Sequence, residues 1–167
     1  PTDFEPNIIF PENTTTAAIV YTVGLLSTTI NSCTDTTTQI VTIYPTPEVI
    51  FTASNTSGCD SLNVVFTNNS DPFNGENITS MTFEWLVNGT PIPPNINTNY
   101  IFTNNTVNDV IYEVTLNGWT SHGCIDSNTV YITIHPDPLA DIDTTTGVST
   151  TNCAPFTIDT VISAVLY

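Results

Sequence analysis

Hydrophobic and polar residues alternate along much of this 167-residue chain, with the period of two that is typical of β-strands. The apolar positions of five such runs are Val49, Phe51 and Ala53; Leu62, Val64 and Phe66; Phe83, Trp85 and Val87; Tyr112, Val114 and Leu116; and Val130, Ile132 and Ile134. Turn-forming groups separate the runs at 55–58, 68–75, 88–94 and 121–123. Because β-branched residues dominate, the pattern predicts about seven short strands per ~90 residues, as in an immunoglobulin-like β-sandwich.

The chain also repeats itself. Four residues recur 91 positions later (112 − 21 = 91 for the first pair): Tyr21, Cys33, Pro45 and Pro47 return as Tyr112, Cys124, Pro136 and Pro138. Cys59 and Cys153 are 94 positions apart, which indicates a short insertion after the second proline pair. The repeat predicts tandem β-sandwiches: the C-terminal part of one domain in 1–45, a complete domain in 46–137 and the N-terminal part of a third in 138–167.

Two proline-containing linkers join the predicted domains. They read Tyr44-Pro45-Thr46-Pro47 and His135-Pro136-Asp137-Pro138. Alternate prolines favour an extended, stiff backbone, so we expect spacers that hold the domains in an extended rod. The partial outer domains lead us to expect that the chain is a slice of a longer polypeptide.

The charge composition narrows the function classes. The chain has no Lys and no Arg against 16 acidic residues, for a formal net charge of −16. Nucleic acids and anionic membrane surfaces are therefore excluded as partners, because Lys and Arg drive both kinds of binding. The apolar run Val161–Tyr167 is too short to insert into a membrane, which takes about 20 residues. With two histidines and no motif that pairs a nucleophile with a base, we expect no enzymatic activity.

Several segments of the predicted complete domain resemble a known family. They read GCDSLNVVFTNNS from 58 to 70, TFEWLVNGT from 82 to 90, YEVTLNG from 112 to 118 and GCIDSNTVYITIHPDP from 123 to 138. The sequence resembles the PKD-type domains that occur in tandem in surface proteins of Bacteroidota. The family's third-strand signature usually reads like WDFGDG. Here Trp85-Leu86-Val87-Asn88-Gly89 keeps the tryptophan and the Asn-Gly turn without the acidic residues, so a binding role attached to those acids is not carried over.

Individual aromatic and imidazole residues have structural interpretations. Trp85 alternates with two other apolar residues, which predicts a core tryptophan rather than a platform for sugar stacking. Trp119 lies beyond its apolar run, where we expect a loop and where a contact role is open. Tyr21 and Tyr112 begin equivalent strands and are expected to form a tyrosine corner. His135, between an isoleucine and a proline, is expected to be structural.

Cys33, Cys59, Cys124 and Cys153 occupy repeat-equivalent places, and no two have zinc-ligand spacing. A disulfide framework suits a secreted chain. In an immunoglobulin-like sandwich Cys59 and Cys124 would lie at opposite poles, about 20 Å or more apart, whereas bonded cysteines have Cα atoms within ~7 Å. We therefore expect each bond to link neighbouring domains, with partners outside this chain.

Asp137, Asp141 and Asp143 cluster after the second linker and carry the oxygen ligands that calcium prefers. The equivalent positions after the first linker are Thr46, Ile50 and Thr52, which argues against a site at every joint. Calcium, the one cofactor considered, and plain solvated surface both remain open interpretations.

Two kinds of glycan acceptor occur. Six Asn-x-Ser/Thr triplets start at Asn13, Asn55, Asn68, Asn77, Asn88 and Asn104, which a chain rich in these residues produces by chance. The resemblance to Bacteroidota proteins implies O-glycan acceptors of the Asp-Ser/Thr type, and the candidates are Thr36, Ser61, Thr144 and Thr160. Chance explains these sites equally well.

The resemblance implies a stalk segment of a very large extracellular adhesin, similar to the giant gliding-motility adhesins that type IX secretion exports to the cell surface. Its partners would be the neighbouring domains of the same chain, the cell-surface or secretion machinery, and glycans. The alternative is a spacer or glycan-contacting module of a secreted polysaccharide-degrading enzyme.

Overall fold

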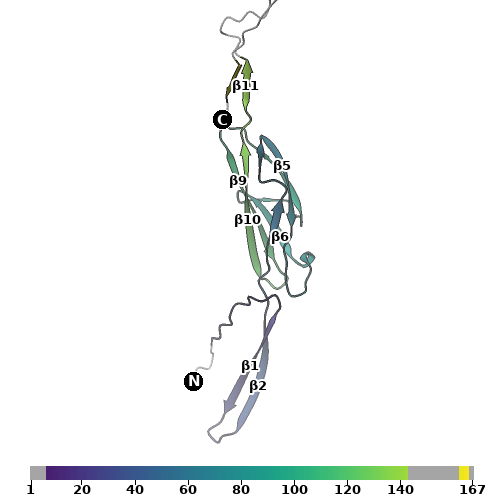
Figure 1. Cartoon of the computed structure of the whole chain (residues 1–167). Helices are drawn as coiled ribbons and strands as arrows, with labels where there is room; N and C mark the ends of the chain where they lie inside the picture. Colours follow the sequence, from purple (N-terminus) through teal and green to yellow (C-terminus); the bar gives the residue numbers. More distant parts are fainter. Residues whose placement is uncertain (1–6, 143–161, 166–167) are drawn as a thin grey trace, which may run out of the picture. The chain divides into compact units, whose positions relative to one another are not determined.

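The structure, a computed structural model, describes residues 7–142 and 162–165. Its regular elements are strands apart from one short 3-10 helix, η1 (Ile78–Ser80), so the described chain is all-β (Figure 1). The strands are β1 (Ile19–Thr28), β2 (Thr34–Ile43), β3 (Phe51–Ala53), β4 (Ser57–Cys59), β5 (Ser61–Asn68), β6 (Thr82–Val87), β7 (Thr90–Ile92), β8 (Thr98–Thr103), β9 (Val110–Trp119), β10 (Ile125–His135), β11 (Leu139–Ile142) and β12 (Ile162–Val165).

These strands form four sheets. A five-stranded sheet has the order β4-β10-β9-β6-β7, and a three-stranded sheet has the order β3-β5-β8. Two further sheets are the antiparallel pairs β1-β2 and β11-β12. The pair β4-β10 is parallel, whereas β4's neighbour in sequence, β3, pairs antiparallel with β5. The chain therefore leaves one sheet and joins the other between Ala53 and Ser57, as strands at the corners of sandwiches do.

The backbone packs as two compact units. One contains the described chain up to Ala53 together with Phe66–Thr98 and Glu113–Val130. The other contains Ser54–Val65, Asn99–Tyr112 and the described residues from Tyr131 onward. The strands β5, β9 and β10 contribute residues to both units, so each unit holds parts of both larger sheets.

In the first unit, side chains from the two larger sheets pack on one another. The ring of Trp85 on β6 lies 4.9 Å from that of Phe51 on β3 and 5.6 Å from that of Phe66 on β5, measured between centroids. Trp85 is fully buried, and its indole N–H donates to the carbonyl of Asn95 at 2.9 Å. The burial confirms the prediction that Trp85 is a core residue. The hydrogen bond supplies the acceptor that a buried indole N–H needs.

In the second unit, Phe102 on β8 packs on Tyr112 on β9 with ring centroids 5.0 Å apart. The Tyr112 hydroxyl donates to the carbonyl of Thr103 at 2.7 Å. A tyrosine that bonds upstream backbone in this way confirms the tyrosine corner predicted at this residue. Contacts between the two larger sheets within each unit are consistent with a β-sandwich.

Burial follows the predicted alternation. The apolar positions of all five predicted runs are buried or half-buried. Their apolar neighbours face outward, as Ile50 (42% exposed), Val65 (47%) and Tyr131 (59%) show. Period-two patterning therefore predicted the inward faces correctly, because successive side chains of a strand point to opposite sides of the sheet.

Trp119 corrects one prediction. It is the last residue of β9, opposite Thr82 of β6, and not a loop residue. The strand extends beyond its apolar run because Gly118 is buried against Val49, so that a glycine takes the inward position.

The predicted turns at 55–58 and 88–94 are too long, because the first includes the start of β4 and the second includes all of β7. Only Asn88 and Gly89, with φ of 47° and 73°, form the two-residue turn between β6 and β7. Pro91 lies in β7, the last strand of its sheet, where a missing N–H is tolerated.

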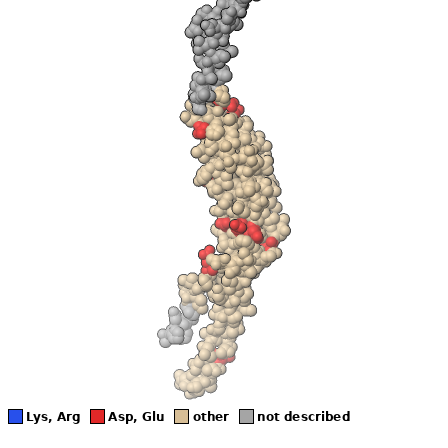
Figure 2. All heavy atoms as spheres, in the orientation of Figure 1, with Lys and Arg blue, Asp and Glu red and all other residues tan. Residues whose placement is uncertain are grey.

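Most of the face shown in Figure 2 carries neither acidic nor basic side chains, and the acidic ones form small separate patches. Among the described residues, no helix is long and apolar enough to cross a membrane.

Candidate functional site

A buried asparagine secures the loop before β1. Asn13 is 4% exposed, and its Nδ2 donates to the carbonyls of Ala17 at 2.8 Å and Ile43 at 2.9 Å. Its Oδ1 accepts the backbone N–H of Thr15 at 3.0 Å and the Thr15 hydroxyl at 2.7 Å. All four hydrogen-bonding positions of the amide are used. The loop is therefore tied to the last residue of β2, directly before the first linker.

The same network occurs 91 residues later. Asn104 is also 4% exposed, and its Nδ2 donates to the carbonyls of Asn108 at 2.8 Å and Ile134 at 2.7 Å. Its Oδ1 accepts the backbone N–H and the hydroxyl of Thr106, both at 2.8 Å. Each residue is the counterpart of one in the first network, and Ile134 lies just before the second linker.

The hairpin turns match at the same spacing. The Cys33 N–H donates to the Thr29 hydroxyl at 3.2 Å, and the Cys124 N–H donates to the Thr120 hydroxyl at 3.2 Å. The residue before each cysteine has a positive φ, 64° at Ser32 and 80° at Gly123. The strands before the turns, β1 and β9, also start and end 91 residues apart.

A second group of contacts joins the two sides of the first linker, and we call these the junction contacts. Asn74 donates its backbone N–H to the carbonyl of Thr16 at 2.8 Å, and its Oδ1 accepts the Ala18 N–H at 3.0 Å. The ring of Tyr44 stacks on His122, with centroids 3.5 Å apart and planes 6° apart. The imidazole is held in place by Glu76, whose Oε1 lies 3.0 Å from Nε2.

Sequence reasoning did not identify these asparagines as structural. The signal was present, because Asn13 and Asn104 each begin an Asn-x-Thr triplet and are 91 residues apart. Asn68 and Asn77 begin two further triplets, and each accepts both the N–H and the hydroxyl of the residue two positions on. The triplets that looked like chance glycan acceptors are, in four of six cases, hydrogen-bonded turns.

The described cysteines, Cys33, Cys59 and Cys124, are free thiols, and Cys153 lies outside the described residues. Cys59 lies opposite His135, the last residue of β10, while Cys124 directly precedes the first residue of that strand. They do not bond to each other, and bonding to neighbouring domains stays a prediction.

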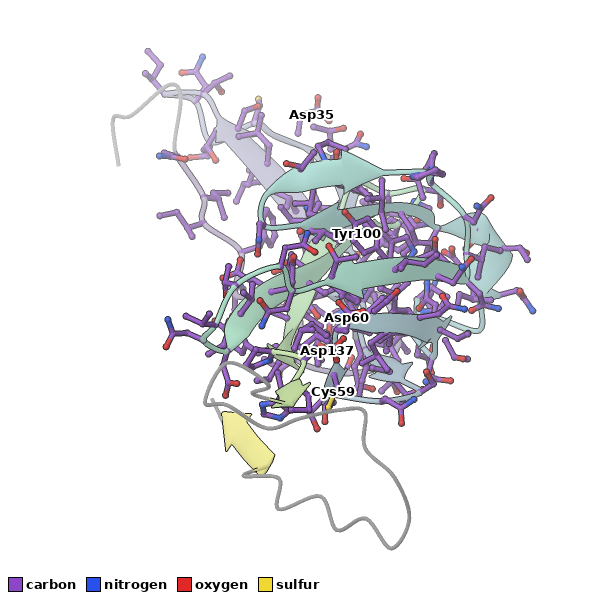
Figure 3. All side chains as sticks on the ribbon, turned by 90° about the horizontal axis from the view of Figure 1, so that it is seen from above. Asp35, Cys59, Asp60, Tyr100 and Asp137 are labelled. Carbon is purple, nitrogen blue, oxygen red and sulfur yellow. The ribbon has the colours of Figure 1, made fainter. Side chains whose placement is uncertain are left out.

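Cys59 and Asp60, both labelled in Figure 3, lie beside the C-terminal end of β10. His135 Nδ1 lies 2.8 Å from the Asp109 carboxylate, and both side chains are about half exposed. Asp60 has a φ of 44°. Its backbone N–H donates to the His135 carbonyl at 3.1 Å, and its backbone carbonyl accepts the Asn104 N–H at 3.0 Å. His135 ends its strand, as predicted, and Asp109 holds its side chain.

The predicted modification sites are accessible where they are described. Thr36 on β2 and Ser61 on β5 are exposed, whereas Thr144 and Thr160 lie outside the described residues. Asp137 is exposed, Asp141 lies on β11, and Asp143 is not described. Within the described part of the chain, no three His, Cys, Asp or Glu residues are placed to hold a metal ion. Calcium binding therefore stays a prediction.

A shallow cavity of about 320 Å³ lies over β9 and β10. Its lining residues are Asn117, Trp119, Ile125, Asp126 and Ser127. Asp126 is engaged in the fold, because its Oδ2 accepts the N–H of Val49 at 2.8 Å. The cavity combines one large aromatic ring with polar groups.

The chain matches no protein-family model, and it matches no curated protein significantly.

Proposed function

We propose that the chain is a segment of a stalk made of tandem immunoglobulin-like sandwiches, resembling PKD-type domains, in a secreted cell-surface adhesin. The stalk would give reach and transmit force in surface attachment or gliding motility. The observation that carries the proposal is the recurrence of the Asn13 network at Asn104. Two sets of the same hydrogen bonds, at the same spacing as the cysteines and prolines, support one structural unit used repeatedly.

The place of these networks suits the transmission of force. Asn13 and Asn104 bind the carbonyls of Ile43 and Ile134, the residues through which tension would leave each sandwich toward its linker. A buried amide with all its partners made resists local unfolding, since opening it exposes several unpaired polar groups.

The parallel pair β4-β10 supports the same proposal. In a tensioned chain, force enters the sandwich through β3, passes on to β4 and leaves after β10. Parallel strands pulled in this way slide past one another, so that their hydrogen bonds are loaded together rather than opened one at a time. The pair is extended by bonds from Thr133 N–H to the Thr56 carbonyl at 2.9 Å and from Asp60 N–H to the His135 carbonyl at 3.1 Å.

The composition supports an exposed extracellular setting. A chain with no Lys and no Arg offers no cleavage site to trypsin-like proteases. A formal net charge of −16 keeps neighbouring stalks from associating, because like charges repel. We therefore place the protein outside the cell, with the neighbouring domains of its own chain and the cell-surface or secretion machinery as its partners.

Mass spectrometry of the native parent polypeptide tests the proposal. Cleavage at acidic residues without reduction should give peptides from many copies of the 91-residue unit, and the intact mass should far exceed the 18.1 kDa of this chain. The same spectra report glycans on Thr36 and Ser61 and disulfides between units. A parent of ordinary enzyme size with a catalytic domain would refute the stalk.

That outcome would favour the second candidate, a spacer or glycan-contacting module of a secreted polysaccharide-degrading enzyme. The cavity beside Trp119 is the observation that favours it, because indole rings stack on sugars and polar neighbours can bind hydroxyl groups. Titration with soluble polysaccharides should then change the fluorescence of Trp119, and Trp119→Ala should abolish the change. Buried Trp85 serves as the internal reference, and an unchanged spectrum would exclude this site.

A further inference from the structure

The junction contacts use a few groups at the C-terminal side of one predicted domain. The groups that bind Asn74 are the Thr16 carbonyl and the Ala18 N–H, and the ring that stacks on His122 is that of Tyr44. Two of these groups are backbone atoms, so the contact depends on the shape of the 13–18 loop more than on its side chains. The Asn13 network holds that loop in shape.

The equivalent positions 91 residues on are Val107, Asp109 and His135. All three are exposed: Val107 by 54%, and the side chains of Asp109 and His135 by 52% and 46%. The Asn104 network holds the 104–108 loop through the same bonds that hold 13–17, so we expect the Val107 carbonyl and the Asp109 N–H to be presented in the same way.

Proline burial shows the difference between the two linkers. Pro45 and Pro47 are buried beside the junction contacts, whereas Pro136 is half-buried and Pro138 exposed. The second linker thus has an accessible surface where the first has a covered one. His135 offers a flat imidazole at the place of Tyr44, and its Nδ1 is engaged by Asp109.

We propose that the surface formed by Val107, Asp109 and His135 is a docking surface for the next copy of the repeat in the same polypeptide. An asparagine in a loop of that copy would bind the Val107 carbonyl and the Asp109 N–H, and a planar side chain would stack on His135. This inference rests on the proposed function, because it needs a copy that follows Pro138.

The chemistry of the surface fits such a partner. The copy in residues 47–137 has no Lys or Arg that could pair with Asp109. Neutral hydrogen bonds and ring stacking remain available, and they are the contacts made at the first linker. Covalent continuity supplies a high effective concentration, so weak contacts suffice for docking.

An in-frame duplication of residues 47–137 in the full chain tests the inference, because it places a known copy after Asp137. The measurement is hydrogen exchange of the Asp109 backbone amide by NMR. We expect exchange to slow by about tenfold relative to the original chain, the effect of one added hydrogen bond. Asn74→Ala in the inserted copy alone should restore fast exchange. Asn55→Ala in that copy, a change at an exposed loop residue, is the matched control and should leave the protection intact.

The outcomes separate the two proposals. If the inserted copy folds, judged by protection of its core strands, and Asp109 still exchanges as in the original chain, the docking surface is wrong while the tandem-domain proposal stands. If the inserted copy does not fold after Asp137, the tandem-domain proposal fails and the docking surface with it.

Discussion

Asn13 and Asn104 are buried polar side chains that connect segments 30 residues apart in the sequence (43 − 13 and 134 − 104). Each amide bonds a threonine two positions on and a carbonyl at the end of a long strand. An apolar side chain of similar size could fill the space but would leave these carbonyls without donors. The stability of the loop therefore depends on the amide itself.

Replacing Asn104 with alanine should destabilise the protein by about 3 kcal/mol, because the Ile134 carbonyl and the Thr106 N–H lose their partner and a buried side chain is removed. Urea unfolding followed by Trp85 fluorescence would measure the loss. Asn105→Ala, at the exposed neighbouring position, should change stability by no more than ~0.5 kcal/mol. Equal effects of the two substitutions would show that the network contributes nothing particular.

Substitutions of Asp60 test the geometry of the turn between β4 and β5. Its φ of 44° lies in the left-handed region, which aspartate tolerates and β-branched residues do not. We expect Asp60→Val to destabilise the fold by about 1–2 kcal/mol and Asp60→Gly to stay within ~0.5 kcal/mol of the parent. Thermal unfolding checks both, and a valine variant as stable as the glycine variant would contradict the turn geometry.

At the scale of elements, the strands and their inward faces were predictable, whereas the extent of several strands was not. The alternation around Phe66 or Val114 is a local pattern and needs no knowledge of the partner strand. The continuation of β9 to Trp119 depends on Gly118, which offers no side chain and therefore no hydrophobic signal. What lies against Gly118 is decided by distant residues.

Gly118 on β9 and Gly24 on β1 allow the same substitution to be compared at a crowded and an open position. A Cβ at Gly118 would lie 2.7 Å from Cγ2 of Val49, a stiff side chain, whereas a Cβ at Gly24 would meet only Thr38 Cγ2 at 3.9 Å. Gly118→Ala should therefore lower the free energy of unfolding by about 1–3 kcal/mol through overpacking. Gly24→Ala should be neutral or raise it by up to ~1 kcal/mol, since alanine suits a strand better than glycine. Chemical denaturation separates the two, and a tolerated Gly118→Ala would refute the close approach.

At the scale of the whole molecule, the proposed function predicts that each copy of the 91-residue repeat unfolds separately under load. In force spectroscopy of the chain that carries the duplication of 47–137, two unfolding events should be seen. Each should release about 300 Å of chain less the folded length of one repeat copy. The two copies have the same sequence and should unfold at similar forces. A single event that releases all of the length would contradict independent domains.

The candidate site was only partly predictable. The 91-residue spacing, read from cysteines, prolines and tyrosines, also relates Asn13 to Asn104, but their triplets resembled chance glycan acceptors. Nothing in a local pattern states that an asparagine is buried, because burial is decided by what packs over it. The junction partners of Asn74 and His122 were likewise hidden, since each contact joins residues more than 50 positions apart.

The sequence by itself determined the β-strand character of the chain, the inward faces of its strands, the core position of Trp85 and the acidic charge. These properties follow from composition and from a period of two, which are local or additive quantities. Only the tertiary structure decided that the chain changes sheets between β3 and β4, that β9 ends at Trp119, and that two asparagines secure the ends of β2 and β10. The physical reason is that a hydrogen bond depends on the position of both partners, and the second partner is placed by the register of strands distant in the sequence.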